Sequence, residues 1–79
     1  MNAAQLSQLV ERALSEGPFT IQQLANDAGI SYDSLYSWAK RRRVPKPDNL
    51  RQLAAAFEHR AEALQTLSTR LKEAADMYE

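Results

Sequence analysis

The chain carries the stretch IQQLANDAGISYDSLYSWAK at residues 21–40, and this stretch decides the fold. In its first half, Leu24 and Ala25 begin an apolar stripe at helical spacing. In its second half, Leu35 and Trp38 form another such stripe. Ala25 has almost no side chain, which lets a second helix cross closely at a steep angle. The stretch therefore predicts two short helices that pack on one core.

A tight turn is predicted between these two helices. Gly29 stands where the first helix must stop and reverse, a position that usually requires positive φ and hence a residue without Cβ. Ile30 fills the corner, and the hydroxyl of Ser31 can cap the next helix. Two helices joined in this way form a helix-turn-helix motif, whose second helix enters the major groove of DNA. The alternative is a helical hairpin with a purely structural role.

Helices are also predicted on both sides of this motif. Asn2 can cap a first helix that runs through Ser15, and Thr20 with Gln23 forms a capping box, so the second helix should begin at Ile21. The third helix should cover residues 32–40. The first helix is predicted to bury the apolar residues that recur at helical spacing, namely Leu6, Leu9, Val10, Ala13 and Leu14.

The segment RRRVPKP at residues 41–47 breaks the helical pattern, because its two prolines force an extended crossing. Pro47 suits the first position of a new helix. Leu53 and Phe57 are needed to close the core over the motif. A coiled-coil seam alternates spacings of four and three residues from Leu50 to Tyr78, and only its part beyond about Glu58 is not needed for the core.

These patterns predict an all-α fold, a compact helix-turn-helix bundle of four to five helices with an extended C-terminal helix. Residues 1–57 should form the helix-turn-helix domain, and residues 58–79 should form a C-terminal helix that makes a homodimer. The alternative is that this helix folds back on its own domain. The residues predicted to make the dimer are Ala61, Leu64, Leu67, Ser68, Leu71, Ala75 and Tyr78.

Composition narrows the classes of function. The chain has 79 residues, no cysteine and a formal net charge of zero, and a domain of this size buries too little surface for a deep catalytic cavity. It lacks an apolar run of about 18 residues that would span a membrane. His59 is the only histidine, and there is no Ser/His/Asp set or Gly-rich phosphate loop. We therefore expect a cytoplasmic, nucleoid-associated protein that is not an enzyme and has no metal, cofactor or small-molecule ligand.

The charge is unevenly distributed, and this indicates a nucleic-acid partner. Five of the ten basic residues lie within residues 40–46, directly after the third helix. DNA phosphates would lie there if that helix sat in the major groove. The alternative is a solvated charged loop. The predicted backbone contacts are Gln22, Tyr36, Lys40, Arg41, Arg42, Arg43 and Lys46.

The exposed N-terminal side of the third helix supplies the predicted base contacts, Tyr32, Asp33 and Ser37. Asp33 could accept a hydrogen bond from a cytosine amine, and the ring of Tyr32 could touch a thymine methyl group. Asp33 could equally serve only as a favourable charge in the first helical turn.

Taken together, these motifs resemble the Xre/Cro-type family of phage-repressor helix-turn-helix proteins over about residues 6–57. The resemblance implies a dimer that binds operator DNA, with base contacts and phosphate contacts at the residues named above. The family usually has glutamine where Ile21 stands, glycine where Arg41 stands and a capping serine where Lys46 stands. The matching residues are Leu9, Gly17, Thr20, LANDAGIS at 24–31, SLYSW at 34–38, Pro45 and LRQLAAAF at 50–57.

Two functions follow from the sequence. The first is a sequence-specific DNA-binding transcriptional regulator of repressor type, which places residues 32–40 in the major groove of double-stranded DNA. The second is a phage or plasmid assembly protein or antitoxin-like adaptor, similar to a terminase small subunit. Such an adaptor would use the same scaffold for protein binding or weak DNA binding.

Overall fold

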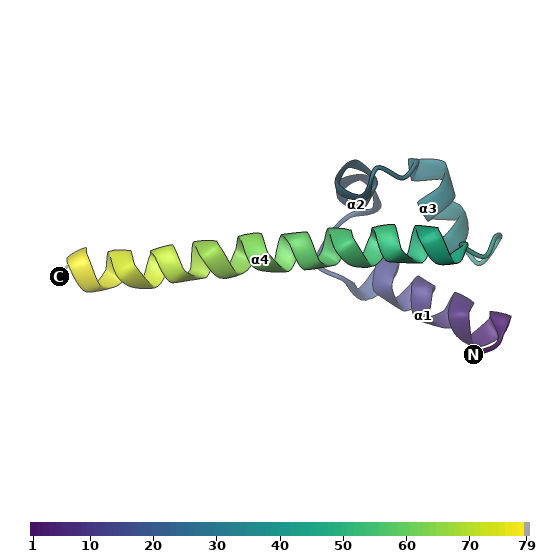
Figure 1. Ribbon diagram of the computed structural model, residues 1–79, viewed down its shortest axis with the longest axis horizontal. Helices are drawn as coiled ribbons and strands as arrows, with labels where there is room; N and C mark the ends of the chain where they lie inside the picture. Colours follow the sequence, from purple (N-terminus) through teal and green to yellow (C-terminus); the bar gives the residue numbers. More distant parts are fainter. Residues whose placement is uncertain (79) are drawn as a thin grey trace.

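A computed structural model describes residues 1–78, and its regular secondary structure consists of helices alone. Helix α1 covers Ala3–Glu16, α2 covers Ile21–Ala28, α3 covers Tyr32–Ala39 and α4 covers Pro47–Tyr78 (Figure 1). The described residues form no strand. The predicted all-α bundle with a long C-terminal helix is confirmed, and so is the predicted start of α2 at Ile21.

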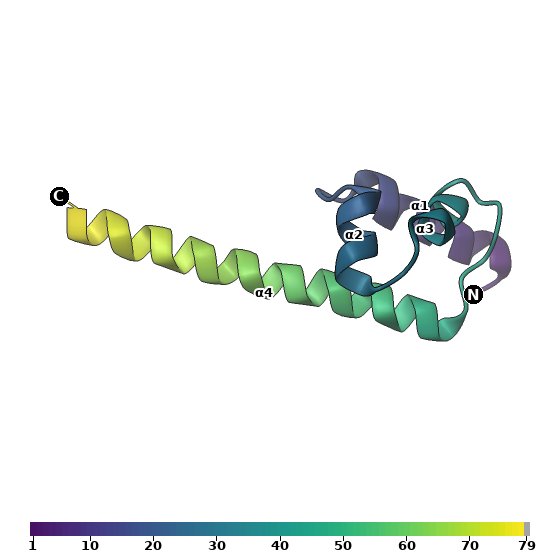
Figure 2. The same ribbon diagram turned by 90° about the horizontal axis from the view of Figure 1, so that it is seen from above.

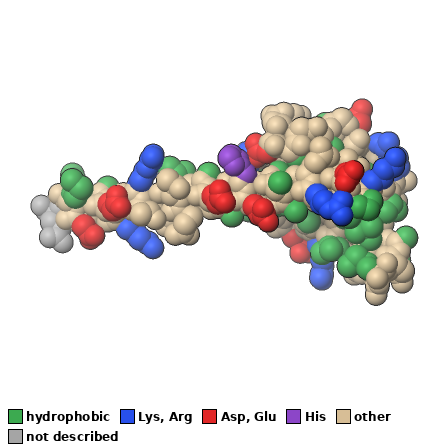
Figure 3. Space-filling model, in the orientation of Figure 1, with side chains coloured by type: hydrophobic (Ala, Val, Ile, Leu, Met, Phe, Trp, Pro, Cys, Tyr) green, Lys and Arg blue, Asp and Glu red, His purple; other side chains and the backbone are tan. Residues whose placement is uncertain are grey.

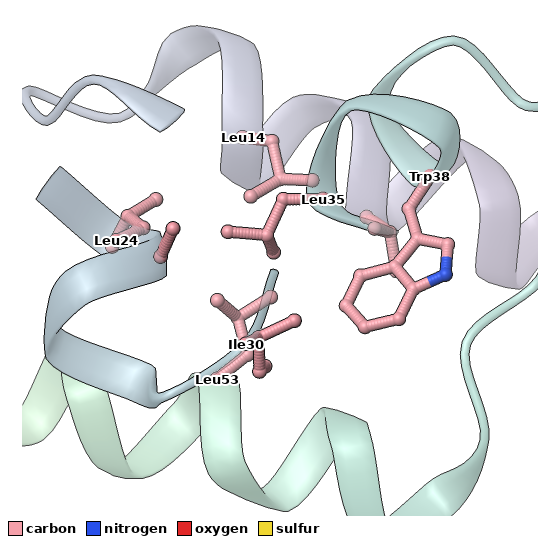
Figure 4. Close-up of a cluster of buried hydrophobic side chains, with 8 residues drawn as sticks. Leu14, Leu24, Ile30, Leu35, Trp38 and Leu53 are labelled. Carbon is pink, nitrogen blue, oxygen red and sulfur yellow. The ribbon is translucent and has the colours of Figure 1, made fainter. Parts of the chain in front are cut away.

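The core lies where the four helices meet (Figure 4). Leu24 of α2 and Leu35 of α3 are completely enclosed. Helix α3 packs on α1 and on α2, and α2 also packs on α4. Ala25 is buried at the α2 crossing, as its small side chain predicts. The other members of the buried cluster are Val10, Leu14, Ile30, Trp38 and Leu53, with Phe19 and Phe57 packed against them.

Side-chain caps begin the first three helices. The Asn2 side chain accepts a hydrogen bond from the Gln5 N–H at 2.8 Å, and the Thr20 hydroxyl accepts one from the Gln23 N–H at 3.1 Å. In both caps the glutamine side-chain oxygen in turn accepts a hydrogen bond from the capping residue's own N–H. Ser31 caps α3. Each cap satisfies N–H groups that the first helical turn leaves without partners, and all three were predicted from the sequence.

Gly29 ends α2 in the left-handed conformation, with φ 68° and ψ 30°. Its N–H donates to the Ala25 carbonyl at 3.0 Å. A Cβ built on Gly29 would meet nothing within 4 Å. The glycine is therefore required by backbone conformation and not by lack of space.

Helix α3 ends on the same kind of turn, but an arginine occupies the left-handed position. Arg41 has φ 58°, and the Arg42 N–H reaches back to the Ser37 carbonyl at 2.8 Å. The Arg41 side chain forms an ion pair with Glu11 of α1. The helix thus ends as it would with glycine at this position, and the arginine additionally ties the turn to α1.

Helix α4 gives the molecule its elongated shape (Figures 1 and 2). The radius of gyration is 15.8 Å, whereas about 12 Å is expected for a compact chain of this length. The helix passes the bundle without interruption and does not fold back on it, so the predicted division near residue 57 falls within a continuous helix. Beyond Arg60, its described side chains are exposed except for the half-buried Ser68. No helix within residues 1–78 combines the length and apolar character needed to cross a bilayer.

An apolar groove of about 400 Å³ separates α1 from α4. Its lining includes Leu6, Leu9, Leu50, Ala54 and Phe57. The sequence placed Leu9 in the core, and this prediction was wrong, because Leu9 is 54% exposed at the groove. The reason is that α1 packs mainly on α3 and α4 packs mainly on α2, which leaves the space between α1 and α4 open.

A second long-range ion pair fastens α4 to the motif. Arg60 of α4 donates to the carboxylate of Asp27 at the end of α2. Its guanidinium also lies over the Phe19 ring, 4.8 Å from the centroid. This hydrogen bond, together with the charge of Arg60, holds the pKa of Asp27 below its ordinary value.

The left-handed turn at Arg41 can be tested with two substitutions. Arg41→Ala and Arg41→Gly both remove the pair with Glu11, but only glycine relieves the backbone. We expect the glycine variant to have a free energy of unfolding about 1 kcal/mol higher than that of the alanine variant. Urea denaturation of both proteins measures this difference. Equal stabilities would mean that Arg41 does not hold positive φ in solution.

The Asp27–Arg60 pair should make the free energy of unfolding depend on pH in the acidic range. Because the pKa of Asp27 is lower in the folded state, the pair contributes fully above the unfolded carboxyl's pKa of about 3.9 and is lost as pH falls through the folded value. Asp27→Asn should therefore flatten the decrease in unfolding free energy below about pH 4. Asp76→Asn, on the exposed end of α4, is the control and should keep the decrease. Identical pH profiles for the two variants would contradict the assignment.

Candidate nucleic-acid interface

The outward side of α3 carries four of the predicted contact residues, two of them exposed and two half-buried. Leu35 and Trp38 turn inward and anchor the helix in the core. On the opposite side, Asp33 is exposed, whereas Tyr36 and Ser37 are half-buried. Tyr32, at the flank of this face, is 45% exposed. All four polar side chains are therefore accessible on a helix whose orientation the core holds firmly.

Tyr36 organises the charges around this face. Its ring stacks against Tyr32, with centroids 6.1 Å apart and an interplanar angle of 17°. The Lys40 Nζ lies 5.6 Å from the Tyr36 centroid, and the Arg42 Cζ lies 5.7 Å from the same centroid. Both distances are within the range of a cation–π contact. The ring therefore holds two cations beside the outward face of α3.

Arg43 joins these cations through a different contact. Its Nη2 donates to the Ser37 hydroxyl at 3.3 Å. The side chains of Arg42 and Arg43 therefore both lie against α3. We call Lys40, Arg42 and Arg43 the cationic cluster. Figure 3 shows basic side chains at the end of the molecule opposite the projecting part of α4, and others elsewhere on the bundle and along α4.

Arg41 occupies a different place from its two neighbours. It faces α1, where Glu11 neutralises it, beside a hollow of about 390 Å³ that Tyr32, Tyr36 and Lys40 also line. Of the three consecutive arginines, two therefore lie along α3 and one holds α3 to α1. The sequence alone did not separate these roles, because Glu11 lies 30 residues earlier in the chain.

Two predicted backbone contacts lie outside the cationic cluster. Gln22 is exposed in the first turn of α2, and its amide donates to Asn26 at 3.1 Å. Lys46 is exposed directly before α4. Within residues 1–78, neither residue forms a hydrogen bond or an ion pair with Lys40, Arg42 or Arg43. Only part of the predicted set is thus brought together at α3.

Tyr36 was predicted from the sequence only as a DNA-backbone contact, and it was not predicted that its ring holds two cations. A signal was present, because Tyr32, Tyr36 and Lys40 follow one another at i, i+4 spacing and must share one side of a helix. Ser37 was predicted to contact bases, and its hydroxyl also accepts a hydrogen bond from Arg43. Among residues 1–78, no group of His, Cys, Asp or Glu side chains is placed to hold a metal ion.

Comparisons with protein-family models, with curated proteins and with solved structures give no match. Any functional assignment therefore depends on the residues themselves. The features that bear on it are the firmly packed α3, the cationic cluster on its outward side and the exposed α4 seam.

The division among the three arginines predicts unequal effects on DNA binding. Arg42→Ala with Arg43→Ala should weaken binding to all duplexes and flatten the slope of log K against log salt by about two units, at about 0.9 per phosphate contact. Arg41→Ala is the matched control and should leave the slope unchanged, because Glu11 already neutralises that side chain. Fluorescence anisotropy over a salt series measures both slopes. An unaltered slope in the double variant would reduce Arg42 and Arg43 to solvated surface charges.

Proposed function

We propose that this chain is a sequence-specific regulator that binds double-stranded DNA with α3 in the major groove. The observation that carries the proposal is the cationic cluster, which Tyr36 and Ser37 hold along the outward side of a firmly packed helix. Phosphates of both groove walls flank a helix lying in the major groove, so cations at its sides can contact them while its face meets base edges. We also propose that residues 6–57 are related to the Xre/Cro-type repressors that their sequence resembles.

The proposed base readers are Tyr32, Asp33 and Ser37. Asp33 is exposed on the outward face and can accept from a cytosine N4 amine, while the Tyr32 ring can touch a thymine methyl group. The Ser37 hydroxyl accepts from Arg43 and keeps its own proton to donate to a base acceptor.

The proposed phosphate contacts are the cationic cluster with Gln22 and Lys46, and Tyr36 positions two of the cations. Arg41 is assigned to holding α3 against α1, because its charge is already paired. An arginine fixed by stacking loses less conformational freedom on binding than one on a mobile loop. The cationic cluster is therefore preorganised for phosphate contact in the absence of DNA.

A homodimer completes the proposal. In the projecting part of α4, Leu64, Leu67 and Leu71 are 54%, 53% and 71% exposed. Burying each such side chain fully would gain about 1.5–3 kcal/mol. Pairing two copies recovers this free energy, and a two-fold dimer can present two recognition helices to successive turns of DNA.

One observation keeps the adaptor function as a second candidate. The outward face of α3 itself presents two tyrosines, an aspartate and a serine, and it offers no Asn, Gln or Arg for bidentate base contact. Stacked aromatic side chains with adjacent cations also suit a protein surface. Selection from random duplexes separates the candidates, since a regulator discriminates between its site and random DNA by about a thousandfold or more.

Asp33 provides the test of base reading. Asp33→Ala should relax discrimination at one base pair by about 1–3 kcal/mol, measured by competition between the selected duplex and its single-base variants. Asp76→Ala removes the same charge at the exposed end of α4 and should leave discrimination unchanged. An Asp33→Ala protein that gains affinity for every sequence equally would show that Asp33 only repels phosphates.

A further inference from the structure

We propose that the groove between α1 and α4 receives the C-terminal end of α4 from a second copy of this chain. The two α4 helices would then run antiparallel, and each copy would fill the other's groove. This inference rests on the homodimer of the proposed function and specifies its geometry. It does not depend on DNA binding.

The groove is an incomplete part of the bundle. Its floor contains Leu50, Ala54 and Phe57 of α4, and its other wall contains Leu6 and Leu9 of α1. The two helices each pack mainly on other partners, so the space of about 400 Å³ between them is unfilled. Leu9 is a large apolar side chain left more than half exposed at this place. A third apolar helix face would cover it.

The α4 seam connects this groove with the free end of the helix. Leu50, Ala54 and Phe57 are the first three positions of the seam, and the same spacing of four and three continues through Leu64 to Tyr78. Because α4 is one uninterrupted helix, the groove and the exposed seam form a single apolar face. An antiparallel helix that pairs with the projecting part can therefore continue into the groove.

Side-chain size selects an antiparallel register for this pairing. Large and small residues alternate along the seam, and layers in which each large residue meets a small one pack most closely. If Ala61 lies opposite the partner's Leu71, then Phe57 lies opposite the partner's Ala75 and Ala54 lies opposite the partner's Tyr78. The last two layers lie in the groove, so the partner's Tyr78, which is 90% exposed in the single chain, gains an apolar site.

Charge selects the same register. The residues flanking the seam then place Glu58 opposite the partner's Lys72, twice in each dimer. Moving the partner seven residues further into the groove would instead place Arg51 opposite the partner's Lys72, which is repulsive. A parallel pair has no comparable match and leaves both grooves empty. The antiparallel pair is also closed, because each copy supplies one groove and one helix end.

Cysteine cross-linking tests this arrangement without interference, since the natural chain has no cysteine. The double variant Ala54→Cys with Tyr78→Cys should oxidise to a covalent dimer with no free thiol. The two positions are about 36 Å apart within one α4, at 1.5 Å per residue, so the bond must join two copies. Each single variant should stay monomeric on a non-reducing gel, because positions 54 and 54, or 78 and 78, lie far apart in the antiparallel pair.

Cross-linking of either single variant would indicate a parallel pair and overturn the proposal. Failure of the double variant to cross-link would overturn it as well. Sedimentation of the same protein then identifies the cause. A dimer would mean that the homodimer of the proposed function forms but leaves the groove unoccupied. A monomer would contradict both the homodimer and the occupied groove. DNA binding is measured separately by the salt slope, so its failure cannot be confused with either result.

A matched pair of charge substitutions provides an independent test. Ala54 and Ala55 are both exposed on α4, but Ala54 faces the groove and Ala55 lies about 100° further round the helix. Ala54→Glu should raise the dimer dissociation constant at least tenfold, while Ala55→Glu should leave it unchanged. Circular dichroism would show whether both variants remain folded. Equal dissociation constants for two folded variants would overturn the proposal.

Discussion

The close crossing of α2 and α3 is the contact on which the rest of the molecule depends. Leu24 and Leu35 are fully buried there and Ala25 is buried beside them, and the left-handed Gly29 ends α2 so that the chain can turn into α3. Helix α1 packs on one side of this pair and α4 on the other. The outward direction of α3, and with it the place of the cationic cluster, follows from this one crossing.

The features that sequence reasoning predicted well are local ones. A cap or a glycine turn involves residues three or four positions apart, so Asn2, Thr20, Gly29 and Ser31 could each be recognised from their neighbours. Contacts between distant segments were not predictable in this way. Glu11 meets Arg41 and Asp27 meets Arg60 across 30 and 33 residues, and Leu9 fails to be buried only because α4 passes at a distance from α1. At the candidate site, the residues were predictable but their mutual contacts were not.

The basic residues divide into those that hold helices together and those that remain accessible. Arg41 ties the end of α3 to α1, and Arg60 ties α4 to α2 while covering Phe19. Lys40 and Arg42 instead lie against an aromatic ring, and among residues 1–78 neither forms an ion pair with a carboxylate, so both charges are exposed to solvent. A chain with zero net charge can thereby gather basic side chains at one end of α3, because most of its acidic residues lie on α1 and α4.

Because α4 is uninterrupted, it acts as a rigid spacer of fixed length. Residues 48–78 contain neither glycine nor proline, so the helix transmits length and rotation rigidly from the bundle to its far end. In the proposed dimer, the separation of the two α3 helices then depends on how many residues lie between the core and the two-fold axis, at about 1.5 Å for each. Seven added residues would lengthen this arm by about 10 Å and keep its face nearly in phase, whereas four would turn the bundle by about 40°. In that proposed dimer, changes in α4 length would therefore change the distance between the two α3 helices without altering any residue of α3.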